Sequence, residues 1–172
     1  IDGQLITNYI WMPSTEKENC LISNTTNDVL KIVVYNRYKI AAPSIAFIKN
    51  FGFTHGAIAS TVAHDSHNII AVGVDDESIM TAINSVIQEK GGVSCVNKTE
   101  TKILALPVAG LMSTADPYEV AEQYTIIDAM SKGLGSKLAS PFMTLSFMAL
   151  LVIPHLKLSD KGLFDGDQFK LF

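Results

Sequence analysis

The densest set of chemically active side chains in this sequence occupies five consecutive positions. Two imidazoles, a carboxylate, a hydroxyl and an amide follow one another in His64, Asp65, Ser66, His67 and Asn68. Together these groups can transfer protons and can both donate and accept hydrogen bonds. Apolar runs typical of buried strands flank the cluster at 57–63 and 69–73. Because buried strands hold a short connection rigidly, this cluster is the first candidate for a functional site.

The spacing of the two histidines allows more than one kind of site. On a strand, His64 and His67 point to opposite faces of the sheet, whereas a tight turn would bring them together. A first-row metal site usually takes three or four protein ligands, and only His55 and His155 remain as further histidines. We therefore expect no metal site in this chain. Metal binding stays open only if a tight turn brings His64 and His67 together. A Ser–His–Asp nucleophile is disfavoured, because triad members normally converge from distant parts of a chain.

Two interpretations of the cluster remain. In the first, Asp65, Ser66 and Asn68 form a turn through side-chain-to-backbone hydrogen bonds, and the histidines are satisfied by ordinary hydrogen bonds. In the second, the cluster belongs to a site that another domain completes. If the chain is extended there, Asp65 and His67 share a face, and the carboxylate would orient the imidazole.

Length and composition limit the class of protein. The chain has 172 residues, of which 48% are hydrophobic, enough for one substantial core, so we expect a single domain over residues 1–172. Its net charge of −4 and scattered basic residues argue against a nucleic-acid partner. The longest apolar run, 142–153, is shorter than the ~20 residues of a membrane span. No signal peptide opens the chain, which predicts a cytoplasmic location without membrane contact.

Cysteine spacing and hydrophobic periodicity predict the class of fold. Cys20 and Cys95 form no Cys-x-x-Cys motif, and we expect both to be reduced packing residues. Strands are predicted at 29–37, 44–49, 56–62 and 68–74, and as a hairpin at 93–96 and 101–106. Helices are predicted at 75–90, 117–133 and 141–152. Consecutive strands with helices between groups of them predict an α+β fold, in which two to three helices back an antiparallel or mixed β-sheet.

The first of these helices has the clearest signals. Asp75 is a predicted N-cap, and Gly91 and Gly92 follow the helix as stop signals. The inner face is predicted from apolar residues at three-and-four spacing, namely Ile79, Ala82, Ile83, Val86 and Ile87.

Three long motifs resemble the C-terminal domain of bacterial adenine deaminases. They are GAIASTVAHDSHNIIAVG at 56–73, LPVAGLMS at 106–113 and PFMTLSFMAL at 141–150, and weaker similarity extends over 3–163. Those enzymes are amidohydrolases, whose metal ligands lie on a (β/α)8 barrel in the N-terminal two thirds of the protein. This sequence has no His-x-His strand motif and is shorter than the roughly 200 residues of a barrel. The resemblance therefore implies a fragment, in keeping with Ile1 rather than Met at its start.

The resemblance also implies a reaction. The parent enzyme would hydrolyse adenine to hypoxanthine and ammonia through a hydroxide made available by manganese or iron. The expected partners are adenine and the N-terminal barrel of the same protein, and a homo-oligomer stays open. At the barrel mouth, His67 and Asp65 would assist catalysis, while His64, Ser66 and Asn68 would contact substrate.

The fragment alone is expected to bind no cofactor and to be inactive, because the barrel is absent. Two other functions remain open. The first is a purely structural or oligomerisation domain of the same enzyme, which never touches substrate. The second is an independent sensor of a metal or ligand.

Overall fold

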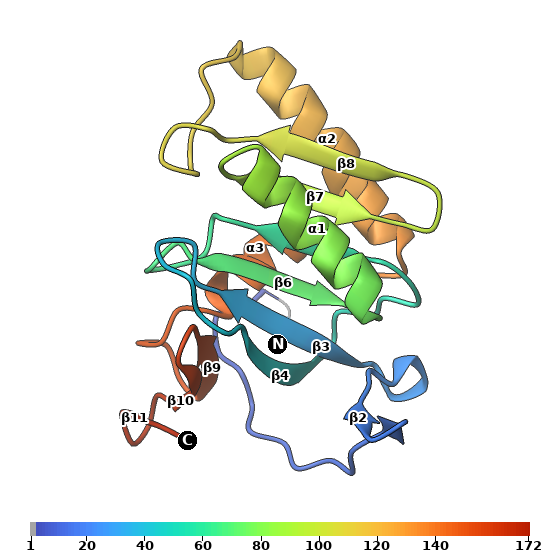
Figure 1. Ribbon diagram of the computed structural model, residues 1–172, viewed down its shortest axis with the longest axis vertical. Helices are drawn as coiled ribbons and strands as arrows, with labels where there is room; N and C mark the ends of the chain where they lie inside the picture. The colour runs from blue at the N-terminus through green and yellow to red at the C-terminus, as the bar shows by residue number, and fades with distance from the viewer. Residues whose placement is uncertain (1–2) are drawn as a thin grey trace.

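A six-stranded antiparallel sheet forms the centre of the molecule, with helices on both of its faces (Figure 1). The computed structural model describes residues 3–172. The helices are the short 3-10 helix η1 (Thr25–Asn27), α1 (Asp76–Gln88), α2 (Pro117–Gly133) and α3 (Pro141–Phe147). The strands are β1 (Glu16–Lys17), β2 (Cys20–Leu21), β3 (Val29–Tyr35), β4 (Ser44–Lys49), β5 (Ala57–Ser60), β6 (Ile69–Gly73), β7 (Gly92–Val96), β8 (Thr101–Ala105), β9 (Leu156–Ser159), β10 (Gly162–Asp165) and β11 (Lys170–Leu171).

The strand order of the main sheet is β4-β3-β6-β5-β7-β8, and every neighbouring pair is antiparallel. The α+β class predicted from the sequence is therefore confirmed, and the main sheet is antiparallel rather than mixed. Two smaller antiparallel sheets, β1-β2 and β9-β10-β11, flank it. Strands β5 and β6 occupy the middle of the main sheet, so the loop that joins them starts from its most buried part.

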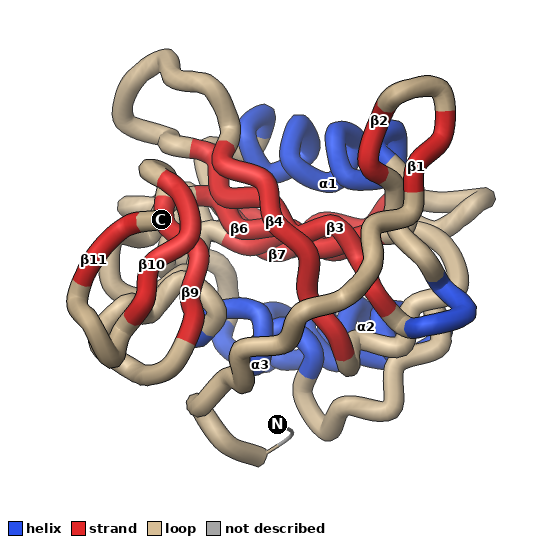
Figure 2. Tube along the Cα trace, turned by 90° about the horizontal axis from the view of Figure 1, so that it is seen from below, coloured by secondary structure: helices blue, strands red, loops and turns tan. Residues whose placement is uncertain are grey.

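The central strands are buried on both faces because helices cover both. Helix α1 lies on one face, and α2 and α3 lie on the other (Figure 2). Successive residues of β5 alternate accordingly: Ala57 and Ala59 pack beneath α1, and Ile58 packs in the larger core beneath α2 and α3. This two-sided burial explains why β5 and β6 appear in the sequence as continuous apolar runs.

Helix α1 begins after the predicted N-cap and ends at Gln88, two residues before the predicted end. The Asp75 side chain accepts a hydrogen bond from the Ser78 amide at 2.8 Å, and the Gly91 amide closes the last turn onto the Val86 carbonyl at 2.9 Å. Three of the predicted inner-face residues are buried, namely Ile79, Ala82 and Val86. The predicted face was too wide, because Ile83 is only half-buried and Ile87 is 46% exposed.

The third helix is shorter than predicted. Helix α3 ends at Phe147, and the chain continues in tight turns, in which the amides of Leu150 and Ile153 bond to carbonyls three residues earlier. The Met148 carbonyl instead accepts the Leu158 amide of β9 at 3.1 Å. Proline at 154 also disfavours helical conformation at the residue before it. The prediction of a helix to residue 152 rested on apolar composition, which took no account of the bond from Leu158 or of the proline.

The packing role expected of both cysteines holds for only one of them. Cys95 lies in the core on β7 with no exposed surface, and burial, with a smaller contribution from Glu100, raises the pKa of its thiol to about 12. Cys20 is exposed on the two-residue strand β2, so the prediction was wrong there. Both cysteines are free.

Lys157 on β9 is a buried cation. Its side chain is among the largest fully buried ones, and its Nζ donates to the Leu5 carbonyl at 2.5 Å. Salt bridges among the described residues do not include it. Burial lowers the pKa of Lys157 to about 8.

This shift predicts a pH-dependent stability. Because the folded-state pKa is about 8, below the unfolded value of about 10.4, the unfolded chain binds more protons between these values. The free energy of unfolding contributed by Lys157 should therefore rise as the pH increases from about 8 to 10, by at most about 1.4 kcal/mol per pH unit. Urea denaturation at several pH values gives the pH dependence of the free energy of unfolding for the wild-type and Lys157→Met proteins. Because all other groups titrate in both proteins, the difference between the two slopes is the contribution of Lys157. Equal slopes would contradict the prediction.

Candidate functional site

The five candidate residues lie in the loop that joins β5 to β6, at residues 61–68. The two strands pair from Ala57 with Gly73 to Ser60 with Ile70, and the chain then leaves the sheet. Residues 64–66 form a turn rather than a continuation of either strand. His67 adopts a left-handed backbone conformation, with φ at 51°, which bulky residues rarely occupy. The loop is therefore bent back on itself at the position of the cluster.

The base of the loop is fixed by Thr61, which is buried. Its hydroxyl donates to the Gly110 carbonyl at 2.6 Å and accepts from the Gly92 amide at 2.8 Å. Gly92 begins β7, and Gly110 belongs to the loop after β8. One hydroxyl thus ties the 61–68 loop to two other segments of the chain.

Thr61→Val is expected to destabilise the protein by roughly 1 to 3 kcal/mol, because it leaves a buried amide and a buried carbonyl without their partner. Valine preserves the shape, so the loss measures the hydrogen bonds. Thr125→Val is the matched control, since the exposed Thr125 hydroxyl only bonds back to the Ala121 carbonyl of α2. Urea denaturation should show a large effect at Thr61 and little at Thr125. Similar effects at both positions would contradict the role of Thr61.

The turn brings the two imidazoles together. The ring centroids of His64 and His67 are 5.7 Å apart in an edge-to-face contact, and the His64 ring also lies 4.9 Å from that of Phe147 in α3. The His64 amide donates to the Ser146 carbonyl at 3.1 Å, and the His67 amide donates to Ala63 at 2.7 Å. Of the two arrangements that the sequence left open, the structure therefore has the tight turn rather than the strand. The amides of His64 and His67 donate to loop and helix carbonyls rather than to a neighbouring strand of the sheet.

The same turn removes the predicted pairing of Asp65 with His67. That pairing required an extended chain, and Asp65 is instead exposed on the turn, without a hydrogen bond to the imidazole. The Nδ1 atom of His67 is buried and has no hydrogen-bond partner in the described part of the chain. His67 therefore has its Nε2 atom left for an external partner.

Ser66 and Asn68 are used to hold the loop. Asn68 is buried, its amide group donates to the Ser66 hydroxyl at 3.2 Å, and its side-chain oxygen accepts from the Arg37 amide at 3.3 Å. The Tyr38 hydroxyl donates to the Ser66 carbonyl at 2.8 Å. These contacts agree only in part with the first interpretation of the cluster. Asn68 makes a side-chain-to-backbone hydrogen bond, whereas the Asp65 side chain makes none within residues 3–172 and the His67 Nδ1 atom has no partner there.

Arg37 and Tyr38 were not singled out from the sequence, yet they support the loop from the end of β3. The Arg37 guanidinium lies 5.1 Å from the Tyr38 ring and donates to the Ala109 carbonyl. These residues also line a hollow of about 610 Å³, together with Thr61 and Gly110. They lie more than 20 residues from the loop in the sequence. No local signal could have connected them with it.

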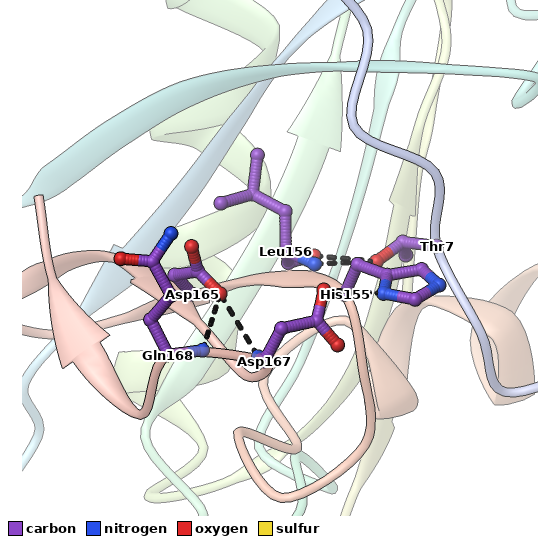
Figure 3. A network of polar contacts seen from close by, with 6 residues as sticks. All are labelled: Thr7, His155, Leu156, Asp165, Asp167 and Gln168. Carbon is purple, nitrogen blue, oxygen red and sulfur yellow. Dashed lines mark hydrogen bonds and ion pairs between the residues drawn. The ribbon is translucent and has the colours of Figure 1, made fainter.

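The other two histidines are occupied elsewhere. His155 Nδ1 pairs with Asp167 at 2.5 Å beside β9 and β10, within the polar network shown in Figure 3. His55 Nδ1 bonds to the Thr54 hydroxyl at 3.0 Å, at the opposite end of β5 from the 61–68 loop. Over residues 3–172, no three His, Cys, Asp or Glu side chains converge to hold a metal ion. Within the same residues, no helix is both long and apolar enough to cross a membrane.

Comparison with known proteins identifies the class to which this fold and loop belong. The family model described as the adenine deaminase C-terminal domain matches residues 4–170. The chain therefore belongs to the adenine deaminase C-terminal domain family.

Individual relatives agree with this assignment. An adenine deaminase of Sulfurovum sp. is 56% identical over 150 residues, which are 87% of this chain and 28% of the relative. One of Borreliella burgdorferi is 52% identical and one of Methanosarcina acetivorans is 49% identical, and each match covers 98% of this chain and 31% of the relative. The chain thus spans about three tenths of the length of the curated relatives that it matches.

Proposed function

We propose that this chain is the C-terminal part of an adenine deaminase, and that its 61–68 loop lies against an adenine site built by the rest of the polypeptide. One observation carries the role of the loop. The side chains of His64, Asp65 and His67 make no hydrogen bond within residues 3–172, although they lie on one turn that other residues hold firmly. The His64 ring packs on Phe147, whereas Asp65 and His67 are left to meet a partner outside these residues.

The chemistry of deamination suits these side chains. Hydrolysis of adenine consumes water and yields hypoxanthine and ammonia, so a proton has to reach the departing amino group. A neutral imidazole donates through one nitrogen and accepts through the other, and a positioned acid or base of this kind accelerates proton transfer. In this proposal, His67 Nε2 exchanges the proton, because its Nδ1 is covered. The exposed Asp65 carboxylate accepts a hydrogen bond from an adenine N–H group.

The metal that the resemblance implies, manganese or iron, does not fit the side chains of this domain. No group of three potential ligands converges within residues 3–172, and two histidines alone are fewer than a metal site takes. In this proposal the metal and its ligands belong to the preceding part of the polypeptide. The 172-residue chain alone should therefore release no ammonia from adenine supplied with manganese.

Hydrogen–deuterium exchange of the full-length protein tests whether the loop meets the ligand. The amides of Asp65 and Ser66 donate no hydrogen bond within the described residues, so they should exchange rapidly in the free protein. Saturation with the product, hypoxanthine, should slow both amides several-fold. The Lys98 amide, at the tip of the β7–β8 hairpin, is the matched control, because it also lacks a hydrogen bond there. Its exchange should not change.

A second candidate function is a structural domain that never approaches the substrate. The contact of the His64 ring with Phe147 favours it, since this contact joins the loop to α3. Unchanged exchange at Asp65 and Ser66 under saturating hypoxanthine would support this structural function and overturn the proposal.

A further inference from the structure

The N-terminal segment of the chain is a strap, residues 5–12, that runs across the open edge of β4 (Figure 2). It makes no regular secondary structure, yet it is firmly attached. The Thr7 amide donates to the Pro154 carbonyl at 3.2 Å, and the Thr7 carbonyl accepts the His155 amide at 3.1 Å. The Thr7 hydroxyl donates to the Leu156 carbonyl at 2.6 Å (Figure 3). The buried Lys157 ammonium holds the Leu5 carbonyl.

The outer side of this strap is apolar and exposed. Ile10 is 58% exposed and Trp11 is 85% exposed. Tyr9 lies between Trp11, at 5.5 Å, and the C-terminal Phe172, at 5.9 Å, and Phe172 is itself 63% exposed. We call these four residues, Tyr9, Ile10, Trp11 and Phe172, the aromatic edge. It joins the two ends of the described chain in one patch.

A hollow beneath the strap extends this apolar surface. It has a volume of about 190 Å³ and lies between Ile10 and Met12 of the strap, Phe47 of β4 and Leu163 of β10. Phe47 is exposed by 38% and Met12 by 37%. The strap therefore presents the aromatic edge outward and leaves a partly open groove along β4, mainly apolar but also lined by Asn8, Lys49 and Asn50.

The charge pattern distinguishes this region from an ordinary surface. Residues 3–15 contain no Asp, Glu, Lys or Arg, although 17% of the whole chain is charged. Exposed apolar patches of this kind mark interaction sites, and the centres of interfaces are depleted in charge and enriched in aromatic residues and Met. An unattached tail would have no fixed face. The bonds of Thr7 and Lys157 hold this one in place before any partner arrives.

The identity of the partner follows from the relatives. The chain covers about 31% of the length of the Borreliella burgdorferi relative, and the family it matches is a C-terminal domain. The missing portion of such a protein therefore precedes the strap along the polypeptide. A segment attached directly to the strap has a very high effective concentration at the patch beside it. It can therefore dock there through contacts that would be too weak to hold a separate molecule.

We propose that the aromatic edge and the groove along β4 are the docking surface for the N-terminal portion of the same polypeptide. This inference rests on the proposed function, in that it takes the chain to be the C-terminal part of a longer enzyme. The contacts are apolar, and Trp11 is their centre. The surface differs from the 61–68 loop, which would meet the substrate.

Hydroxyl-radical footprinting of the full-length protein, without substrate, tests this surface. Labelling of Trp11 and Met12 is normalised to that of the denatured protein and compared with Tyr118 and Met80, which are 86% and 58% exposed on α2 and α1. Trp11 and Met12 should be labelled several-fold less than these controls. Labelling of Trp11 equal to that of Tyr118 would overturn the proposal. Protection of Trp11 that disappears on dilution would also overturn it, because it would assign the surface to a second copy of the chain.

A pair of substitutions supplies an independent measurement. Trp11→Ser should lower the thermal midpoint of the full-length protein, whereas Tyr118→Ser, at an equally exposed aromatic residue, should not. A Trp11→Ser protein with an unchanged midpoint would contradict the docking role. Neither measurement requires catalysis or bound hypoxanthine. If the loop proposal fails, these measurements still test the aromatic edge. If the aromatic edge proposal fails, the exchange experiment still tests the loop.

Discussion

His67→Ala in the full-length protein is expected to lower kcat/KM for adenine by roughly 10²- to 10⁴-fold, the usual range for a lost acid or base. The reason is geometric. The loop is fixed by Thr61, Ser66 and Asn68, while the His67 imidazole makes no hydrogen bond within residues 3–172. Removal of the imidazole should therefore slow proton transfer strongly and change the stability of the fold little. Steady-state ammonia release, measured at equal metal content, gives the ratio.

Two other histidines make this experiment specific. His55→Ala is the matched control, because that imidazole bonds to Thr54 at the far end of β5, and it should leave kcat/KM near the wild-type value. His64→Ala should affect stability more than rate, since the His64 ring packs on Phe147. The thermal midpoints of all three variants separate the two kinds of effect. Wild-type rates in both His64→Ala and His67→Ala would leave the loop with a structural role only.

Ile79→Ala is expected to reduce the free energy of unfolding by about 2 to 5 kcal/mol. Ile79 is 3% exposed on the inner face of α1, where it packs with Ala82 and Val86 against the central strands. Truncation leaves a cavity between helix and sheet, because the surrounding backbone is hydrogen-bonded and relaxes only partly. Urea denaturation followed by circular dichroism measures the loss as a shift of a single cooperative transition.

Ile83→Ala provides the same chemical change four residues further along the helix. Ile83 is only half-buried, so its truncation should cost clearly less than that of Ile79. An equal loss at the two positions, or no loss at Ile79, would mean that α1 packs on the sheet through a different face.

The sequence contained enough information for most of the secondary structure. Asp75 and Gly91 delimit α1 through hydrogen bonds between neighbouring residues, which a local pattern can predict. Strands β5 and β6 were recognisable as apolar runs because helices cover both faces of the sheet. The end of α3 was not predictable in this way. It depends on the pairing of Met148 with Leu158 of β9.

The candidate site was likewise predictable in part. The types of its side chains and the family of the chain could be recognised from residues 56–73 and two further motifs. The arrangement of these side chains could not. The turn at His64 depends on the Ser146 carbonyl, and the base of the loop depends on Gly92 and Gly110, all distant in the sequence.

The sequence by itself therefore determined which elements form and which chemical groups the β5–β6 loop carries, because propensity, capping and burial act over a few residues. Only the tertiary structure decided that His64 and His67 meet on one turn, that Asp65 makes no hydrogen bond to His67, and that Ser66 and Asn68 hold the loop. It also decided that an uncharged N-terminal strap lies against β9 and β4 with Trp11 outward. These features depend on contacts between segments far apart in the chain, whose geometry no local pattern records.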